Sequence, residues 1–356
     1  MTQPRRLAPL GIALLFVAGC LDNDGPAADA GRTDVARQDG APDGAASTVT
    51  VPLTIADYPG ASGKLLLAPV SVNGSPTVNV LLDTGSSGLR VLAAALGGTN
   101  VTTTTEATLT QFGGEILTGH KASGRLTIGG VTAPGEIDFD LVEKISCIPN
   151  DPYCDPATVA KEVEDAGIQG VMGIGLRGGS SGIVSPLPQL GAPLSRGFTL
   201  RTGGFGAKTG ELVLGAAELP GAATITLKSA GALPGGATAW ADDQIQLCYR
   251  VNDADTDPPC SEAVLDTGSN LDVIHARNLP ASAITADGLL APGVTFEVSH
   301  ADGFTMKLTV GSPITWSLDG ILVDDQEAFT ILGLGVFFRH DVAFDLGHGK
   351  IGLLPR

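Results

Sequence analysis

The residues best suited to chemistry in this sequence lie in a short segment that occurs twice. The stretches LLDTGSSGLRV (81–91) and AVLDTGSNLDVI (263–274) each place a short apolar run directly before Asp-Thr-Gly-Ser. An apolar run that ends in Asp and Gly is typical of a buried strand entering a tight turn. Two carboxyl groups that share a proton can act as acid and base in one step, which a single carboxylate cannot do. The repeat therefore indicates Asp83 and Asp266 as a catalytic pair.

A second motif follows each acidic turn further along the chain. It consists of two apolar residues and a glycine, VMG at residues 171–173 and ILG at residues 331–333. The strand that ends in the acidic turn and this later apolar strand can lie side by side, which would hold the turn from below and aim its Asp outward. Two lobes built in this way and facing each other would bring the two aspartates together at the join.

Length and composition favour short strands over long helices. The 356 residues are 43% hydrophobic but only 4% aromatic, and they include 49 Gly and 23 Pro. This composition suits many short strands joined by tight turns, and the length is enough for one large domain or two ordinary ones. A net charge of −17 would repel nucleic acid, so we expect no nucleic-acid partner.

The order of the predicted strands suggests two lobes. Strand alternation begins at TVTVPLTI (48–55), and turns are predicted at Asn73-Gly74 and at Gly113-Gly114. The strand pattern starts again near residue 221. We therefore predict an all-β protein with lobes at residues 49–220 and 221–356. The helical candidates are residues 156–166 and the stretches directly after each Asp-Thr-Gly-Ser.

The N-terminal residues 1–48 are not expected to belong to the fold. Arg5 and Arg6 precede a short apolar run, and small residues stand directly before Cys20. This arrangement resembles a bacterial lipoprotein signal (residues 1–20) in which Cys20 carries the lipid. An ordinary signal peptide or a membrane helix is the alternative, although the apolar run is short for a membrane span. Residues 21–48, rich in Asp, Ala, Gly and Pro, are predicted to form a disordered acidic tether. The membrane would then be a partner through Cys20, and the protein would lie lipid-anchored in a bacterial cell envelope.

Four further cysteines suggest disulfides in an exported chain. They are Cys147, Cys154, Cys248 and Cys260, and sequence alone allows three connectivities. Because they form two local pairs, we predict Cys147–Cys154 and Cys248–Cys260, each contributing roughly 2–3 kcal/mol in the chain-entropy description. The spacings do not fit a zinc site.

The segments quoted above resemble those of the two-lobed pepsin-like aspartic proteases. LLDTGSSGLRV and AVLDTGSNLDVI match the two active-site turns, and IQGVMGIG (168–175) matches the first apolar-apolar-Gly strand. The last part of the chain, FTILGLGVFFRHDVAFDLGHGKIGLLP (329–355), resembles the C-terminal segment of that family, and the pair Cys248 and Cys260 is similar to the family's layout. The resemblance runs from about residue 64 to the end. It implies two lobes, each a six-stranded-type β-barrel, with the active site at the join.

The resemblance also implies an aspartic endopeptidase. One ionised member of the pair Asp83 and Asp266 would take a proton from a bound water, while the protonated member would donate to the scissile carbonyl. No metal or other cofactor is needed, and the substrate would be an extended polypeptide bound by a monomer. Six neighbouring residues would support the pair through backbone N–H groups, hydroxyls and bonds to the opposite lobe: Thr84, Gly85, Ser86, Thr267, Gly268 and Ser269.

Three positions depart from the family pattern. Arg90 stands where the family usually has Trp, and Phe112, next to Gly113, stands where the substrate-covering flap usually has Tyr. Leu334 replaces an acidic residue after the second apolar-apolar-Gly motif, which should raise the pKa values of the pair and move its optimum to mildly acidic or neutral pH. These changes leave open an alternative, a catalytically silent pepsin-like protein that binds a peptide or protein at the cell envelope.

Two other patterns have simpler explanations. GGSSG (178–182) fits the Gly-x-Ser-x-Gly pattern of serine hydrolases, but a Gly/Ser-rich loop produces this match easily. DADTDPP (253–259) begins like a calcium loop but has Pro258 and Val264 where such a loop needs Gly and Glu. A solvated acidic loop inside a disulfide is the preferred interpretation of the second pattern.

Overall fold

The structure, a computed structural model, describes residues 48–58, 62–149, 154–179, 182–233, 236–324 and 329–356. The lipoprotein-like signal and nearly all of the acidic tether lie outside these residues, so both stay predictions. No helix within the described ranges has the length and apolar character needed to cross a membrane.

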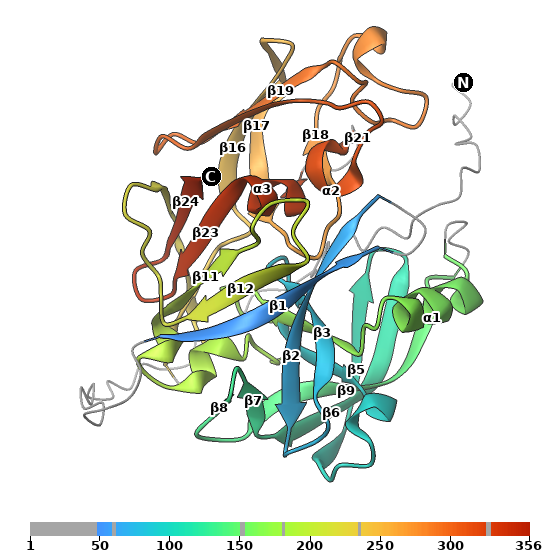
Figure 1. Cartoon of the computed structure of the whole chain (residues 1–356), viewed down its shortest axis with the longest axis vertical. Coiled ribbons are helices and arrows are strands. Elements are labelled where there is room, and N and C mark those ends of the chain that lie inside the picture. Colours follow the sequence, from blue (N-terminus) through green and yellow to red (C-terminus); the bar gives the residue numbers. More distant parts are fainter. Residues whose placement is uncertain (1–47, 59–61, 150–153, 180–181, 234–235, 325–328) are drawn as a thin grey trace.

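Most of the described chain is β-strand (Figure 1). The strands of the first half are β1 (Val49–Asp57), β2 (Lys64–Val72), β3 (Val78–Asp83), β4 (Ser87–Leu92), β5 (Thr102–Phe112), β6 (Glu115–Gly124), β7 (Leu126–Ile128), β8 (Val131–Thr132), β9 (Ile137–Cys147), β10 (Gly170–Ile174), β11 (Gly197–Arg201) and β12 (Thr209–Leu214). Those of the second half are β13 (Ala223–Thr226), β14 (Ser229–Ala232), β15 (Thr238–Trp240), β16 (Ile245–Val251), β17 (Ala254–Leu265), β18 (Asp272–His275), β19 (Thr295–Ser299), β20 (Thr305–Thr309), β21 (Ile321–Asp324), β22 (Phe329–Leu332), β23 (His340–Asp345) and β24 (Lys350–Pro355).

Helices are short. The α-helices are α1 (Pro156–Asp165), α2 (Trp316–Asp319) and α3 (Leu334–Arg339), and the 3₁₀ turns are η1 (Ala93–Leu96), η2 (Leu187–Leu190), η3 (Leu194–Arg196) and η4 (Ala281–Ala283). The prediction of a helix from residue 156 is confirmed. The prediction of helices directly after the acidic turns is wrong, because β4 and β18 follow there. Both strands pair with the neighbouring apolar strand, and this tertiary pairing outweighs local propensity.

The strands form sheets of fifteen, seven and two members. The largest sheet runs in the order β13-β24-β23-β11-β12-β1-β2-β3-β10-β4-β9-β6-β5, with β7 and β8 attached through β2. The seven-stranded sheet belongs to the second half and runs β20-β19-β16-β17-β22-β18-β21. This mainly β arrangement with a lobe at each end confirms the predicted fold class, while the boundary at residue 221 stays a prediction.

The two halves share one continuous sheet at their join. The first half supplies β1, β11 and β12, the second supplies β13, β23 and β24, and the halves meet where β11 pairs antiparallel with β23. Figure 1 shows these strands between the lobes. Phe198 and Phe344 face each other in this register and stack with ring centroids 4.7 Å apart. One hydrophobic core cluster extends through both halves, from Val51 to Leu353.

The predicted crossing of strands beneath each acidic turn is present twice. In the first half, β10 lies between β3, to which it runs parallel, and β4, to which it runs antiparallel, so that Gly173 lies opposite Asp83. In the second half, β22 lies in the same way between β17 and β18, with Leu332 opposite Leu265. The apolar-apolar-Gly motif therefore forms the base on which each turn sits.

Two hairpin turns and both disulfides agree with what the local sequence predicts. The turn between β2 and β3 places Asn73 and Gly74 at φ 51° and 72°, a conformation that these residue types tolerate best. Gly113, at φ 52°, opens the turn between β5 and β6. The predicted disulfides Cys147–Cys154 and Cys248–Cys260 are both formed.

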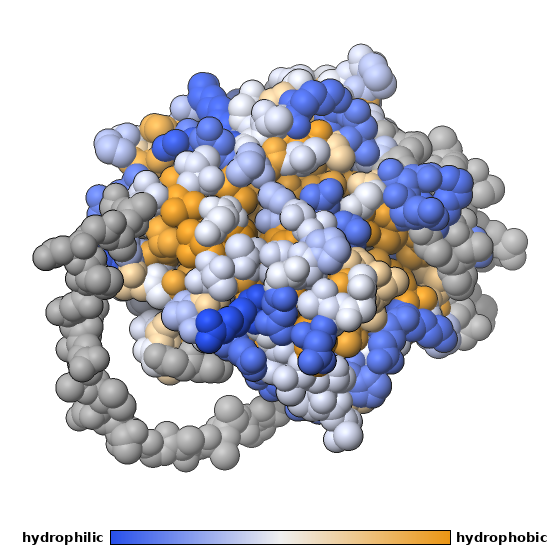
Figure 2. Space-filling model, turned by 60° about the horizontal axis from the view of Figure 1, so that its bottom comes forward, coloured by the Kyte–Doolittle hydropathy of each residue, from blue (hydrophilic) through white to orange (hydrophobic). Residues whose placement is uncertain are grey.

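Most large apolar side chains are buried. Figure 2 shows one face of the molecule, on which hydrophobic residues lie at several places among hydrophilic ones. Among the described residues, Leu109 on β5 is the one large hydrophobic side chain that is mostly exposed (65%). The apolar content of the sequence is therefore used mainly in the core.

Gly173 offers a test of the strand crossing. A Cβ at this position would lie 2.7 Å from the carbonyl carbon of Ser87 and 2.8 Å from that of Ser86. Backbone atoms cannot move aside easily, so Gly173→Ala should lower the free energy of unfolding by about 1–3 kcal/mol. Urea denaturation measures the effect. The exposed Gly135 has no atom within 4 Å of such a Cβ, and Gly135→Ala should stay within about 1 kcal/mol of the wild type. Equal effects of the two substitutions would contradict the described crossing.

Candidate active site

The strand crossings bring Asp83 and Asp266, here called the aspartate pair, to one place. Asp83 is the last residue of β3, Asp266 directly follows β17, and they are 1% and 0% exposed. A Cβ built on Gly268 would lie 3.0 Å from Oδ1 of Asp83 and 3.1 Å from Oδ1 of Asp266. A Cβ on Gly85 would lie 2.5 Å from the same Asp266 oxygen. Only glycine leaves room for two carboxyl groups at this point.

The two members of the pair accept different numbers of hydrogen bonds. The Gly85 N–H donates to Oδ1 of Asp83 over 2.7 Å, and the Ser86 hydroxyl donates to Oδ2. The Gly268 N–H donates to Oδ1 of Asp266 over 2.7 Å. The expectation that Ser269 also binds its aspartate needs correction. Its single hydroxyl proton goes to the Leu271 carbonyl, 2.7 Å away within the same turn.

Asp266 is left with one oxygen that no described donor reaches. This atom, Oδ2, is fully buried. Burial raises the pKa of Asp266 well above its ordinary value, and the nearby charge of Asp83 raises it further. The pair therefore favours a state in which one carboxyl group holds a proton and the other is ionised.

Two threonines tie the acidic turns together across the join. The Thr84 N–H donates to Oγ1 of Thr267 and the Thr267 N–H donates to Oγ1 of Thr84, both over 3.0 Å. The Thr84 hydroxyl donates to the Leu265 carbonyl (2.6 Å) and the Thr267 hydroxyl to the Leu82 carbonyl (2.7 Å). These four buried bonds fix the spacing of the turns in the manner that the resemblance implies.

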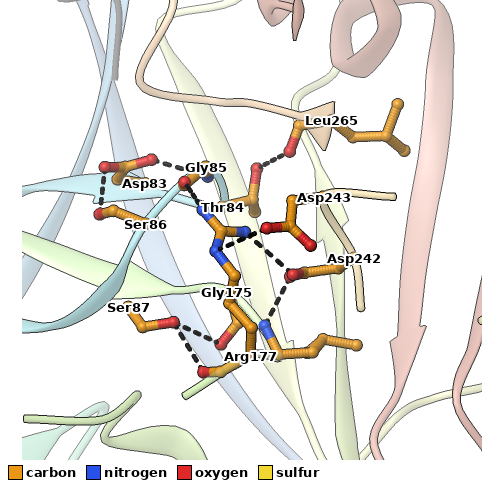
Figure 3. Close-up of polar contacts among 11 residues, drawn as sticks. Asp83, Thr84, Gly85, Ser86, Ser87, Gly175, Arg177, Asp242, Asp243 and Leu265 are labelled. Atoms are coloured by element: carbon orange, nitrogen blue, oxygen red, sulfur yellow. Dashed lines mark hydrogen bonds and ion pairs between the residues drawn. The ribbon is translucent and has the colours of Figure 1, made fainter. Parts of the chain in front are cut away.

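Arg177, which sequence reasoning did not single out, lies beside the first turn. Figure 3 shows its guanidinium between the carbonyl of Gly85 and two carboxylates of the second half, Asp242 and Asp243. It donates to Gly85, lies 2.9 Å from Asp242 and forms a 3.5 Å ion pair with Asp243. Its position shortly after the VMG strand was the one signal in the sequence that could have drawn attention to it.

A second overlooked residue, Asp272, lies beneath the second turn. Its carboxylate accepts the Gly333 N–H over 2.7 Å and is 3% exposed. Leu334, the position that lacks the family's acidic residue, directly follows Gly333, is buried, and donates its N–H to the Ser269 carbonyl over 3.0 Å. The second half therefore does carry a buried acid at the strand crossing, supplied by a different residue.

The two flap departures contact each other. The Arg90 guanidinium lies over the Phe112 ring, 5.1 Å from its centroid, and its Nε donates to Oγ1 of Thr110 over 3.1 Å. Phe112 ends β5, is 1% exposed, and packs with Leu65, Leu81 and other buried side chains. A cation–π contact of this kind can join the hairpin to the lobe without the Trp and Tyr that it replaces. Gly113 forms the turn directly after Phe112.

The described parts of the remaining patterns show no second site. Part of GGSSG lies outside the described residues. In the acidic stretch 253–259, Asp253 pairs with Lys307 and Asp255 with Arg250, at 2.6 and 3.2 Å. Over the described ranges, no group of three or more His, Cys, Asp or Glu is placed to hold a metal ion.

The fold and the paired turns define a pepsin-like architecture. An aspartic proteinase from Irpex lacteus has a similar structure, with a TM-score of 0.58 and 16% identity, over 86% of this chain and 97% of that one. No curated protein sequence matches this chain. Residues 49–312 match the family described as the PE-PGRS C-terminal aspartyl peptidase-like domain, and the chain belongs to that family.

The buried Asp272 should make stability depend on pH. Burial raises its pKa from 3.8 to about 6. Between these values the folded protein holds a proton that the unfolded chain has released, so this group's contribution to stability falls as pH rises. The fall amounts to about 3 kcal/mol for a shift of about two units. Asp272→Asn removes this titration. The free energy of unfolding of the variant, relative to wild type, should rise by about that amount from about pH 3.5 to about pH 7 in urea denaturation. The exposed control Asp287→Asn should show no such trend. If the difference in the free energy of unfolding between Asp272→Asn and wild type did not change with pH, the raised pKa of Asp272 would be refuted.

The threonine bonds give a second test. Thr84→Val keeps the shape but leaves the Thr267 N–H and the Leu265 carbonyl buried without their partner. It should cost at least about 2 kcal/mol of the free energy of unfolding. Thr84→Ser keeps the hydroxyl and should cost about 1 kcal/mol for the lost methyl group. Similar losses in the two variants, measured by urea denaturation, would show that the hydroxyl bonds contribute little.

Proposed function

We propose that the protein is an aspartic endopeptidase whose catalytic residues are Asp83 and Asp266. The observation that carries this proposal is the aspartate pair itself. Two carboxyl groups from two matched turns are buried at one point, unequally hydrogen-bonded, with the pKa of Asp266 raised well above its ordinary value. Membership of an aspartyl peptidase-like family supports the same function.

The pair provides the acid and the base of a hydrolysis. The ionised carboxylate takes a proton from a water molecule between the two groups, and the water attacks the peptide carbonyl. The protonated carboxyl group donates to the carbonyl oxygen, so that a neutral tetrahedral diol forms and later collapses to the two products. When the diol collapses, the proton taken from the water passes from its carboxyl group to the leaving amine, and one diol hydroxyl gives a proton back to the other carboxylate, which restores a singly protonated pair. The substrate is an extended polypeptide, whose main chain can pair with the edge of the hairpin β5–β6.

We also propose that the chain is exported and lipid-anchored through Cys20 in a bacterial cell envelope, where it acts as a monomer. The N-terminal segment supports this through its arginines, its short apolar run and the small residues before Cys20. The two disulfides support an oxidising compartment.

The second candidate is a pepsin-like binding protein without catalysis. The observation that favours it is the changed flap, in which Arg90 and Phe112 contact each other. The retention of both aspartates and of their backbone donors favours the enzyme, because a binding protein has no need to keep two repelling carboxyl groups buried together.

Replacement of either aspartate separates the two candidates. The purified chain should cleave a denatured protein somewhere between about pH 3 and about pH 8, with its optimum in the mildly acidic to neutral part of this range. Asp83→Asn and Asp266→Asn should each reduce the rate about a thousandfold or more, and the double variant should lose little further, because either change destroys the shared proton.

The exposed carboxylate Asp287 provides the control, since Asp287→Asn should leave cleavage unchanged. Asp83→Asn and Asp266→Asn should also bind a statine-containing peptide inhibitor more weakly than wild type, since the inhibitor hydroxyl occupies the place of the attacking water. An active Asp83→Asn variant would refute the mechanism. A wild-type chain that binds extended peptides but never cleaves them would establish the second candidate.

A further inference from the structure

We propose that Arg177 is a positioning residue of the aspartate pair. It fixes the turn that carries Asp83 to the second half of the chain, and it directs the shared negative charge to Asp83 and the shared proton to Asp266. This inference rests on the proposed function and assigns unequal roles to two turns of almost identical sequence.

The donors of Arg177 are used within the protein. Nη2 donates to the Gly85 carbonyl, Nη1 to Oδ1 of Asp242 over 2.9 Å, and Nε lies 3.5 Å from Oδ2 of Asp243. The side chain is 19% exposed and that of Asp242 only 2%. A guanidinium held on three sides by protein acceptors has little capacity left to bind a substrate. Its role is therefore to hold other groups.

The group that it holds is the first acidic turn. Gly85 is fixed from two sides, because its N–H donates to Asp83 and its carbonyl accepts from Arg177. The neighbouring backbone is tied as well. The Gly175 N–H donates to the Ser86 carbonyl over 2.8 Å, and the Ser87 hydroxyl donates to the Arg177 carbonyl over 2.9 Å. The segment after β10 thus runs along the turn and clamps it.

The segment after β10 is also bonded to residues of the second half. Oδ2 of Asp242 accepts the Leu176 N–H over 2.6 Å, and the Trp240 N–H donates to the Leu176 carbonyl over 3.0 Å. Asp242 and Asp243 lie just after β15, separated from it by Ala241. Arg177 therefore adds a charged link between the halves, next to the neutral links made by the two threonines.

Among the described residues, no cation donates to the backbone of the second turn; Arg339 acts on Asp272 beneath it and donates to the carbonyls of Leu318 and Gly335. Arg177 follows the glycine of the VMG motif, and the corresponding place after Gly333 holds Phe337, which is fully buried. The Asp83 carboxylate accepts bonds from Gly85 and Ser86, whereas one buried oxygen of Asp266 has no donor among the described residues. A shared negative charge is more stable on the carboxylate with more donors, and a shared proton on the oxygen with none.

The charged groups around Arg177 determine in which direction it shifts the pKa values of the aspartate pair. Those that face Arg177 are Asp83, Asp242 and Asp243. Burial alone would lower the pKa of Arg177, but these carboxylates raise it above its ordinary value, so the guanidinium stays charged. The groups that face Asp266 are Asp83, whose charge raises its pKa, and Arg177, which lowers it against the larger effect of burial. Burial also raises the pKa of Asp242, and Arg177 opposes this. Removing the Arg177 charge should therefore raise the apparent pKa values of the pair.

Titration of the carboxyl groups tests this without any need for catalysis. The full chain is labelled with ¹³C at the aspartate carboxyl groups, and the signals of the pair are those lost in Asp83→Asn and Asp266→Asn. Wild type should show the shared proton on the carboxyl group of Asp266. Arg177→Met should move the apparent pKa values of the pair upward by about one unit, whereas Arg177→Lys, which keeps the charge, should move them by less than half of that. Asp243→Asn removes an opposing charge and should move them downward.

A proton on Asp83 in place of Asp266, or unchanged pKa values in Arg177→Met, would overturn the proposal. If Arg177→Met does not fold, the partly exposed Asp243 carries the test, and an unchanged or upward shift in Asp243→Asn would overturn it equally.

The pH profile of cleavage provides the second measurement. In Arg177→Met the acidic limb of kcat/KM should move upward by the same amount as the titration, and Arg177→Lys should restore it. If Arg177→Met lowered kcat/KM by the same factor at every pH and left its pH profile in place, Arg177 would only stabilise the fold. A wild-type chain that cleaves nothing would refute the proposed function, while the ¹³C titration would still decide the role of Arg177.

Discussion

Two carboxyl groups buried against each other repel, and much of the structure around them compensates for this repulsion. Backbone N–H groups of Gly85 and Gly268 supply partial positive charge at short range without adding an ion. The glycines also make the close approach sterically possible. The threonine bonds then prevent the turns from moving apart, which is the simplest way in which the repulsion could be relieved.

Surroundings give two nearly identical turns different chemistry. Both contain Asp-Thr-Gly-Ser, and both rest on an apolar-apolar-Gly strand. The first is bordered by a partly buried arginine with its two carboxylates, and the second by the buried acid Asp272. A symmetric pair of carboxyl groups would have no preferred site for the proton. The asymmetry lies almost entirely in residues that come after each turn in sequence.

Much of the fold was predictable because its signals are local or repeated. The hairpin at Asn73-Gly74, the helix from residue 156 and the crossing of each apolar strand beneath its turn follow from turn chemistry and from a motif present twice. The local cysteine pairs followed from their spacing. β4 was mistaken for a helix because its pairing with β10 depends on residues far away in sequence.

The site was predictable only in part, for the same reason. Asp83, Asp266 and the threonines belong to the motifs themselves. Arg177 and Asp272 do not, and their importance depends on partners such as Asp242 and Gly333, which sequence does not place beside them. The hydroxyl of Ser269 donates to the Leu271 carbonyl and not to Asp266. The sequence alone does not decide between these two acceptors.

The shared sheet at the join has a consequence for how the chain is made. One edge of β11, at residues 197–201, pairs with β12, but the other edge finds its partner only when β23, at residues 340–345, is present. During synthesis, the first half therefore emerges with an unsatisfied strand edge that stays open until β23 has been made. Such an edge is a template for pairing with other chains. A chain released early would be more hazardous than a merely inactive one, and folding is complete only when both termini of the folded region are in place.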